Sequence, residues 1–249
     1  MTYCVATMFD AGIVMASDSR TNAGVDNVAT FRKMKIFETP GERVIGIVNS
    51  GNLAITQATL NKIDEAVRRR LDINVLTVPS MYEVAELIGV ALRDVRHRDG
   101  PYLMQSNVDA GASFIVGGQI AGEPQRLFMV YAEGNFIEAT EETPYFQIGE
   151  TKYGKPIIDR VITPNIDMDD AVKCVLVSFD STMRSNLSVG PPFDMLCYAR
   201  DSLRVMHLRR FEENDTYLRT IRKHWSEGVR RAFAELPQPD WMEPPAGNA

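Results

Sequence analysis

Residues 1–20, MTYCVATMFDAGIVMASDSR, carry the clearest structural pattern in the chain. The runs Tyr3–Met8 and Ile13–Ser17 consist of residue types that favour strands, and Asp10-Ala11-Gly12 between them is a turn signal. This pattern predicts a β-hairpin that begins almost at the first residue. The extreme N-terminus is therefore expected to be part of a sheet.

Strands and helices follow this hairpin in groups. Further strands are expected near 31–37, 43–49, 113–119, 126–132, 136–139, 146–148, 194–200 and 204–210. Helices are expected over 53–70, 80–97, 155–162, 168–183 and 215–234, the second of them with Ser80 as its N-cap. Because strands and helices come in separate groups, their order differs from the strict strand–helix alternation that builds a parallel sheet. It predicts an α+β fold, a four-layer αββα sandwich of two antiparallel sheets with helices on the outside of each.

Composition predicts one globular domain. The chain has 249 residues, of which 45% are hydrophobic and 24% charged, a balance typical of soluble proteins with ample material for a core. No Pro/Gly/Ser-rich or charge-only stretch separates two regimes of composition. One domain is therefore expected over 1–236, followed by a loose tail at 237–249.

Charge and cysteine content argue against several classes of function. The chain has a net charge of −6, which argues against the concentrated basic surface that nucleic-acid binding needs. No run of about 18 apolar residues could span a membrane, and the N-terminus has no basic segment typical of a signal peptide. Three widely spaced cysteines and three histidines show no spacing of a disulfide framework or a metal site. We expect a cytoplasmic protein without a metal or cofactor.

Thr2 is a candidate for chemistry because of its position. Methionine aminopeptidases remove Met1 when the next residue is small, which would leave a free α-amino group on Thr2. Such an amine titrates at about 7.7–8.0, so it can accept the proton of its own hydroxyl group. One residue would then supply both nucleophile and base. Threonine at position 2 is common, however, and taken alone it is more often an unremarkable residue.

An acidic and a basic residue follow in the places where they could assist Thr2. Ser17-Asp18-Ser19-Arg20 comes at the end of the second hairpin strand, which returns beside residue 2. Lys33 and Lys35 both qualify as a partner for Asp18, and as neighbours two apart on one strand they are expected to face the same side. A lysine there would lower the pKa of the Thr2 hydroxyl and amine. Each of these residues alone is more often part of a surface ion pair.

Together these residues resemble the catalytic β subunits of the proteasome. That family has an N-terminal threonine, an aspartate in a D-x-R motif and a lysine, here matched by Thr2, Asp18 with Arg20, and Lys33 or Lys35. The resemblance extends to Val44–Gly51, similar to the family's strand whose final glycine N–H forms the oxyanion hole. We also expect Gly51 to open the following helix, whose positive N-terminus suits a developing oxyanion.

The chain departs from the family pattern at two positions. Arg184-Ser185-Asn186-Leu187-Ser188 occupies the place of the family's R-D-x-x-S segment, which contacts the threonine amine, and Ser185 replaces its aspartate. A second helper serine of the family falls at Glu150. Ser188 matches the motif and is expected to brace the site with Arg20, whereas Ser185 and Glu150 are weaker candidates.

A narrower resemblance covers nearly the whole chain. Ser17–Asp26, Phe31–Met34, Ser50–Leu53 and Asp180–Pro192 are similar to the Anbu family, the bacterial proteasome homologues called ancestral β subunits. In that family the site lysine precedes a methionine, which favours Lys33 over Lys35. The resemblance implies a proteasome-like N-terminal nucleophile (Ntn) hydrolase fold and a self-assembling threonine-type peptidase or amidohydrolase.

Two further interpretations of the function stay open beside general peptide hydrolysis. One is a narrow-specificity amidase acting on a small or modified peptide, and the other is a ring-forming scaffold with little protease activity. The resemblance implies a homo-oligomer, either a ring or an open helical assembly, and a peptide or protein substrate. The helices expected over 53–70 and 80–97 are predicted interface elements, and no ATPase partner is assigned.

Overall fold

The computed structural model describes residues 2–22, 28–239 and 241, which fall into two compact units, Met1–Glu213 and Asn214–Ala249. Met1 and most of the expected tail lie outside the described residues. The single domain expected over 1–236 stays a prediction. Within the described part of the chain, every helix is too short or too polar to cross a membrane.

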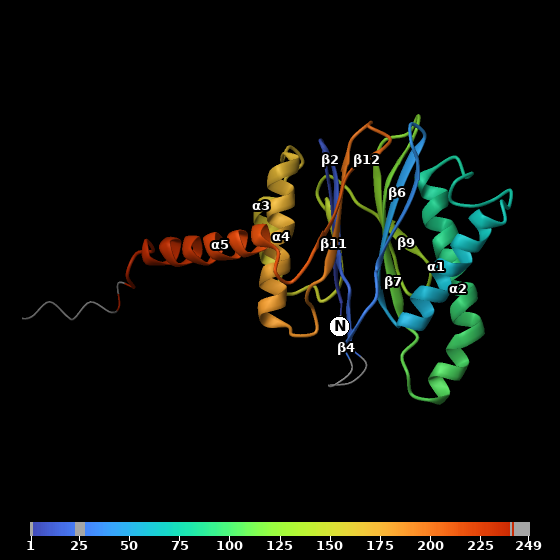
Figure 1. Ribbon diagram of the computed structural model, residues 1–249, viewed down its shortest axis with the longest axis horizontal. Coiled ribbons are helices and arrows are strands. Elements are labelled where there is room, and N and C mark those ends of the chain that lie inside the picture. Colours follow the sequence, from blue (N-terminus) through green and yellow to red (C-terminus); the bar gives the residue numbers. More distant parts are fainter. Residues whose placement is uncertain (1, 23–27, 240, 242–249) are drawn as a thin grey trace, which may run out of the picture. The chain divides into compact units, whose positions relative to one another are not determined.

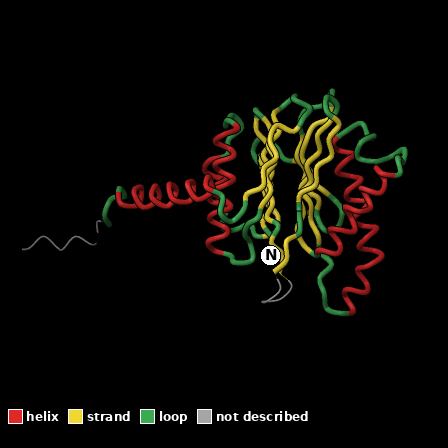
Figure 2. The backbone as a smooth tube through the Cα atoms, viewed as in Figure 1, coloured by secondary structure: helices red, strands yellow, loops and turns green. Residues whose placement is uncertain are grey.

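Two five-stranded antiparallel sheets form the centre of the first unit (Figure 2). One sheet has the order β10-β1-β2-β11-β12, made of Tyr145–Gly149, Tyr3–Phe9, Gly12–Asp18, Phe193–Ala199 and Val205–Phe211. The other has the order β5-β6-β7-β8-β9, made of Met34–Thr39, Arg43–Gly51, Ala112–Ile120, Arg126–Val130 and Phe136–Glu138. A small hairpin of β3 (Arg20–Asn22) and β4 (Val28–Thr30), which the sequence did not predict, follows β2 directly.

Helices cover the outer face of each sheet (Figure 1). Helices α1 (Leu53–Arg68) and α2 (Met81–Gln105) pack on β6 and β7, whereas α4 (Met168–Ser185), with α3 (Lys155–Val161) beside it, packs on β1, β2 and β11. The expected αββα sandwich is confirmed. The second unit contains α5 (Thr216–Ala234), with Asp215 as its N-cap.

The predicted N-terminal hairpin is confirmed and lies inside its sheet. Strand β1 pairs with β2 from Cys4↔Ser17 to Phe9↔Gly12, and its other edge pairs with β10 from Tyr3↔Gly149 to Thr7↔Tyr145. Burial is nearly complete along both strands because the other sheet covers one face and helix α4 the other. Thr2 therefore stands at the end of a strand that is hydrogen-bonded on both sides.

The helix predicted over 80–97 begins as expected but ends later. Ser80 and Glu83 form a capping box, in which each side chain bonds the backbone N–H of the other. The helix then continues to Gln105 through Gly100 and Pro101. The extra turns hold Leu103 against the core, and this packing outweighs the loss of one backbone hydrogen bond at Pro101.

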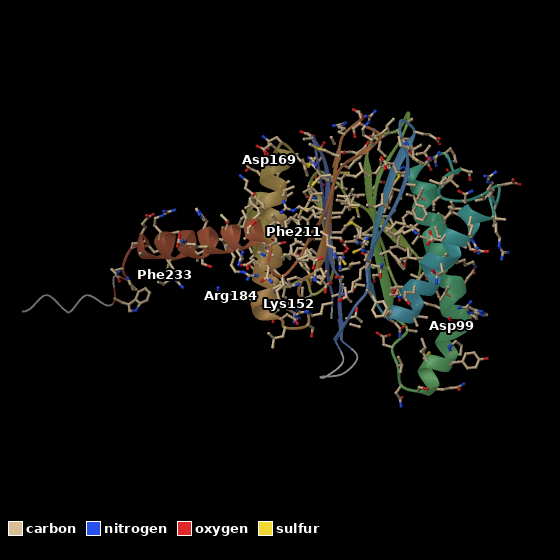
Figure 3. All side chains as sticks on the ribbon, in the orientation of Figure 1. Asp99, Lys152, Asp169, Arg184, Phe211 and Phe233 are labelled. Atoms are coloured by element: carbon tan, nitrogen blue, oxygen red, sulfur yellow. The ribbon has the colours of Figure 1, made fainter. Side chains whose placement is uncertain are left out.

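Apolar layers hold the sandwich together, and side chains fill the space between the sheets (Figure 3). The inner cluster joins the facing sides of the sheets, with Ile13, Met15, Val48, Ile115 and Leu196 among its fully buried members. On the opposite face of the first sheet, Phe179, Phe193 and Phe211 stack with ring centroids 4.6 and 4.8 Å apart. This packing fixes the end of β2 at Asp18 and the start of β11 at Phe193, which pairs with Asp18.

Candidate active site

A buried ion pair lies at the end of β2. Lys33 Nζ is 2.9 Å from Asp18 Oδ1, and the side chains are 5% and 0% exposed. The same carboxylate oxygen accepts the backbone N–H of Tyr3 at 3.1 Å. Lys33 Nζ also donates to the carbonyl oxygen of Arg20 at 2.6 Å. The pair is thus bonded directly to the residue that follows Thr2.

The main chain of Lys33 is held by Asn49 of β6. Both the backbone N–H and the side-chain Nδ2 of Asn49 donate to the carbonyl oxygen of Lys33, at 3.1 and 2.9 Å. The Asn49 carbonyl in turn accepts a hydrogen bond from Cys4 Sγ at 3.3 Å. The sequence pattern did not identify Asn49 as a site residue, because its only signal was a lone asparagine in an apolar strand. Burial raises the pKa of the Cys4 thiol, so this cysteine stays protonated.

Lys33 and Lys35 do not face the same side, which corrects the expectation from their spacing. Lys35 Nζ bonds Asp64 of α1 at 2.7 Å, and both side chains are about one-third exposed or more. Lys33 lies just before β5 begins at Met34, where the alternation of a regular strand no longer applies. Only Lys33 of the two reaches Asp18.

The backbone of Thr2 is held by the turn after β10. Thr2 is 8% exposed, and its carbonyl oxygen accepts the N–H of Glu150 at 2.7 Å. Gly149 precedes this contact with φ of +85°, and a Cβ atom on it would stand 2.0 Å from the Thr2 carbonyl oxygen. The sequence pattern did not identify Gly149 as a site residue either. Only glycine allows the two backbones to approach so closely.

Replacing Gly149 by Ala is expected to displace Thr2 and to destabilise the fold. The clash and the left-handed φ together cost about 1–3 kcal/mol or more of the free energy of unfolding. Gly122→Ala is the matched control, because Gly122 has φ of +87° but no atom within 4 Å of the position that a Cβ would take. Urea denaturation measures both variants. Equal losses in the two would contradict a specific contact between Gly149 and Thr2.

Gly51 ends a strand and does not open a helix, contrary to the expectation from sequence. It is the last residue of β6, and α1 begins at Leu53 with Asn52 as N-cap, whose side chain accepts the N–H groups of Ala54 and Ile55. Asn49 N–H points to Lys33, and alternate residues of a strand direct their N–H groups to the same edge. Gly51 N–H therefore points to the same edge, beyond the start of β5.

The segment 184–190 contacts the candidate site through Leu187, which bonds Arg20, and Asn186, which bonds Glu150. Arg20 Nη1 donates to Leu187 O at 3.0 Å, and Ser188 N–H donates to Asn186 Oδ1 at 2.9 Å. Ser185 ends α4 as an exposed residue. The buried Asn186 instead donates from Nδ2 to Glu150 Oε2 at 3.0 Å. This glutamate–asparagine contact joins the two segments in which the chain departs from the family pattern, and sequence reasoning gave Asn186 no role.

Burial dominates the electrostatics of Asp18. It raises the pKa of this carboxyl group from 3.8 to about 6, although the Lys33 charge and the hydrogen bonds from Lys33 and Tyr3 act to lower it. The other carboxylate oxygen, Oδ2, is buried and has no hydrogen-bond partner among the described residues. At neutral pH the group is ionised, and Lys33 faces an anion.

The stability of the fold is expected to depend on pH through Asp18. Because its folded-state pKa of about 6 lies above the usual 3.8, the carboxyl group contributes stability at low pH. This contribution is lost as the pH rises through about 6. The advantage of the wild type over Asp18→Asn in free energy of unfolding should therefore shrink between pH 4 and pH 7, measured by urea titration at each pH. An advantage that grows over this interval would contradict the raised pKa.

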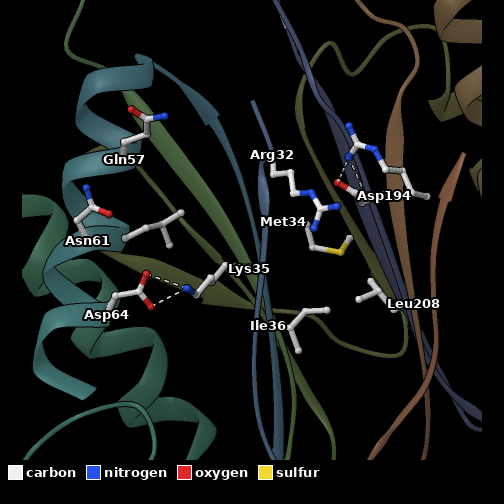
Figure 4. A pocket seen from close by; sticks show the side chains of 11 residues that line it. Arg32, Met34, Lys35, Ile36, Gln57, Asn61, Asp64, Asp194 and Leu208 are labelled. Atoms are coloured by element: carbon white, nitrogen blue, oxygen red, sulfur yellow. Dashed lines mark hydrogen bonds and ion pairs between the residues drawn. The ribbon is translucent and has the colours of Figure 1, made fainter. Parts of the chain in front are cut away.

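A cavity of about 630 Å³ opens beside β5. Figure 4 shows Lys35 reaching Asp64 on one side of the strand, while Arg32 and Met34 face Asp194 and Leu208 on the other. Arg32 and Met34 flank Lys33 in the chain, so the cavity begins next to the candidate site. Its lining is mixed in charge and includes Arg210, which bonds Asp194 at 2.9 Å.

Comparison with known proteins gives concordant matches. A family model described as "Proteasome subunit" matches residues 2–196. The helical assembly of the Anbu complex from Pseudomonas aeruginosa is 48% identical, with 97% of this chain and 100% of that chain covered and a TM-score of 0.92. Anbu from Yersinia bercovieri is 47% identical, with 96% and 98% covered and a TM-score of 0.90.

A further match comes from a third organism. The Gly-1 mutant of Anbu from Hyphomicrobium sp. strain MC1 is 46% identical, with 96% of this chain and 100% of that chain covered and a TM-score of 0.89. The search of curated proteins found no significant match. The three solved structures each cover 96% or 97% of this chain.

Proposed function

This chain belongs to the proteasome subunit family, in its Anbu branch, and from that premise we propose that it is an N-terminal threonine hydrolase of peptide or amide bonds. The observation that carries the proposal is the buried Asp18–Lys33 pair, bonded at 3.1 Å to the backbone N–H that follows Thr2. Burying a pair of opposite charges at a strand end costs desolvation free energy, so such a pair is expected to serve a function. Activating an adjacent nucleophile is such a reason.

In the proposed reaction Thr2 acts after Met1 has been removed. Thr2 Oγ attacks the carbonyl carbon, its proton passes to the free α-amine of Thr2, and an ester bond to the acyl group forms as the C–N bond breaks. The amine proton goes to the leaving nitrogen, and water then hydrolyses the ester. The Lys33 charge favours the alkoxide form of Thr2, while Asp18 holds Lys33 in place. Gly51 N–H donates to the oxyanion.

The remaining site residues are assigned positioning roles. Arg20 bonds the Leu187 carbonyl and thereby ties the D-x-R segment to the loop that contains Ser188. Glu150 holds the Thr2 carbonyl through its N–H, and its carboxylate accepts a hydrogen bond from Asn186. Ser185 is exposed at the end of α4, and Lys35 pairs with Asp64, so neither is given a role.

The cavity beside β5 is the proposed binding site of the substrate chain. It adjoins Lys33, and its walls carry both acidic and basic side chains with the apolar Met34, Ile36 and Leu208 between them. A narrow-specificity amidase stays the second candidate, because the chain has Glu150 and Ser185 in place of the family's serine and aspartate, and Glu150 bonds Asn186 instead. A scaffold with little activity is the third.

Intact mass and covalent labelling test the mechanism. Purified protein should lack the mass of Met1, and a peptide epoxyketone, which reacts with a hydroxyl group and a free amine of one residue, should form an adduct on Thr2. Peptide mapping locates the adduct. Retention of Met1 would remove the free amine and rule out this mechanism for the chain. Labelling without turnover of any member of a peptide library would favour the scaffold.

We also propose that the chain self-assembles in the cytoplasm. The relative from Pseudomonas aeruginosa is described as a helical assembly, and 97% of this chain aligns with it. Helices α1 and α2 keep their predicted role as interface elements. The three cysteines are free and buried, in keeping with a reducing compartment. Light scattering across a wide range of protein concentration tests assembly, and a monomer throughout would contradict it.

A further inference from the structure

The ionisable side chains that line the cavity beside β5 are not balanced in charge. Three of them are cationic and two are anionic. The cations are Arg32, Lys35 and Arg210, and the anions are Asp64 and Asp194. The lining therefore holds one cation more than its own carboxylates can neutralise.

Both carboxylates of the lining are already paired with the other two cations. On one side of β5, Lys35 Nζ bonds Asp64 at 2.7 Å. On the other side, Arg210 Nη1 bonds the two oxygens of Asp194 at 3.0 and 2.9 Å. Arg210 also bonds Glu212, an exposed residue outside the lining, through Nε at 3.1 Å. The carboxylates next to the cavity are thus held by Lys35 and Arg210.

Arg32 is the cation that these pairs leave over. Among the described residues, its side chain takes part in no hydrogen bond and no ion pair, and it is exposed. Figure 4 shows it on the same side of β5 as Asp194 and Leu208. An arginine side chain stays charged and binds carboxylates through parallel N–H···O bonds. A free guanidinium group at the wall of a cavity is therefore suited to an anionic ligand.

The place of Arg32 in the chain puts this cation close to the candidate nucleophile. Arg32 directly precedes Lys33, so their Cα atoms are about 3.8 Å apart. Lys33 bonds Asp18, which in turn bonds the backbone N–H after Thr2. An extended peptide advances about 3.3 Å per residue. A ligand group that contacts Arg32 therefore belongs to a residue within about three positions of a bond that Thr2 attacks.

We infer that the peptide substrate carries a carboxylate group within about three residues of the cleaved bond, and that Arg32 binds this group. The inference rests on the proposed function, because it gives a chemical class to the substrate of that same site. The carboxylate belongs either to an aspartate or glutamate side chain or to the C-terminus of a short peptide. Arg32 is then a residue that determines specificity.

The net charge of the whole chain, −6, would by itself favour a basic substrate. At physiological ionic strength, however, charges separated by more than about 8 Å are largely screened from one another. Most of the acidic residues of the chain are outside the lining. The cation inside the cavity therefore has more influence on the choice of substrate than the distant negative charges.

Peptide binding to the full-length Thr2→Ala variant, which cannot cleave its ligand, tests the inference. The probes are short rhodamine-labelled alanine peptides with an amidated C-terminus and one central Glu, Gln or Lys, followed by fluorescence anisotropy. The Glu peptide should bind about 5–10-fold more tightly than the Gln peptide, with an advantage that falls as NaCl is added. An all-alanine peptide with a free C-terminal carboxylate, compared with its amide, identifies a terminal carboxylate as the source instead. Equal affinities in both comparisons would overturn the inference.

Charge reversal separates Arg32 from the charge of the protein as a whole. Arg32→Glu in the Thr2→Ala background should remove the preference for the carboxylate and make the Lys peptide bind most tightly. Arg204→Glu is the matched control, because Arg204 is also exposed but is outside the cavity lining. It changes the net charge equally and should keep the original order of affinities. Circular dichroism checks that both variants are folded. A carboxylate preference that survives in Arg32→Glu, or that Arg204→Glu abolishes to the same extent, would show the inference to be wrong.

Labelling of Thr2 in the wild type distinguishes failure of this inference from failure of the proposed function. If the epoxyketone labels Thr2 but all peptides bind equally, the hydrolase proposal stands and only the role of Arg32 fails. If Thr2 is not labelled, the hydrolase proposal fails, and the carboxylate loses its meaning as a substrate group whatever the anisotropy shows. Labelling together with the expected order of affinities supports both.

Discussion

Thr2→Ala is expected to lower peptide hydrolysis by about 10⁴-fold or more, while the fold is retained. The substitution removes the hydroxyl group that attacks the carbonyl but leaves a small residue, so that Met1 is still removed. Thr2 is held by its backbone carbonyl through Glu150 N–H at 2.7 Å, a bond that alanine keeps. Turnover of a peptide library and epoxyketone labelling, both followed by mass spectrometry, measure the loss.

Thr2→Ser is the matched control for this prediction. Serine keeps both the hydroxyl group and the free α-amine, and Met1 is removed from it in the same way, so labelling and turnover should persist at a reduced rate. Circular dichroism should be the same for the two variants. Hydrolysis that survived in Thr2→Ala would move the activity to another residue or to a contaminant, and the threonine mechanism would then be wrong.

Lys33→Met is expected to have the second largest effect, on both rate and stability. Without the lysine charge, the Thr2 hydroxyl and amine lose the group that lowers their pKa, and hydrolysis should fall by about 10²–10⁴-fold. Asp18, fully buried, would also lose its counter-ion. Breaking a buried pair in this way costs about 3–5 kcal/mol of the free energy of unfolding. The loss should be smaller at about pH 5, where Asp18 takes up a proton.

Two controls separate the catalytic part of this effect from the structural part. Asp18→Asn/Lys33→Met leaves no buried charge unpaired, so it should recover most of the lost stability without recovering hydrolysis. Lys35→Met removes only the partly exposed pair with Asp64, worth about 0–1 kcal/mol. If Lys35→Met slowed hydrolysis as much as Lys33→Met, or if the double variant regained activity, the role assigned to Lys33 would be wrong.

The order of strands and helices was predictable from the sequence because it depends on local patterns. Alternating apolar runs around Asp10-Ala11-Gly12 predicted the N-terminal hairpin, and the capping box at Ser80 predicted the start of α2. The end of α2 was less predictable, since packing of Leu103 on the core carries the helix through Gly100 and Pro101. Tertiary contacts of this kind leave no local signal.

The residue types of the candidate site were likewise predictable, as were the motif positions of Thr2, Asp18 and Lys33. Their local geometry was not. Strand alternation put Lys33 and Lys35 on one side, but β5 begins only at Met34, so Lys33 lies outside the strand and reaches Asp18. Gly51 proved to end a strand, because Asn52 is the residue that caps α1.

The residues that support Thr2 could be found only in the folded chain. Gly149, Asn49 and Asn186 act through contacts with residues more than 15 positions away in the sequence, and none is a defining position of the motifs quoted above. The sequence by itself determined the sandwich, its N-terminal strand and the residue types at its edge, since these follow from periodicity and local chemistry. Residue spacing left Lys33 and Lys35 both open, and the family resemblance favoured Lys33, but only the tertiary structure shows that Lys33 contacts Asp18 and which backbone holds Thr2, because those contacts depend on where separate strands end in space.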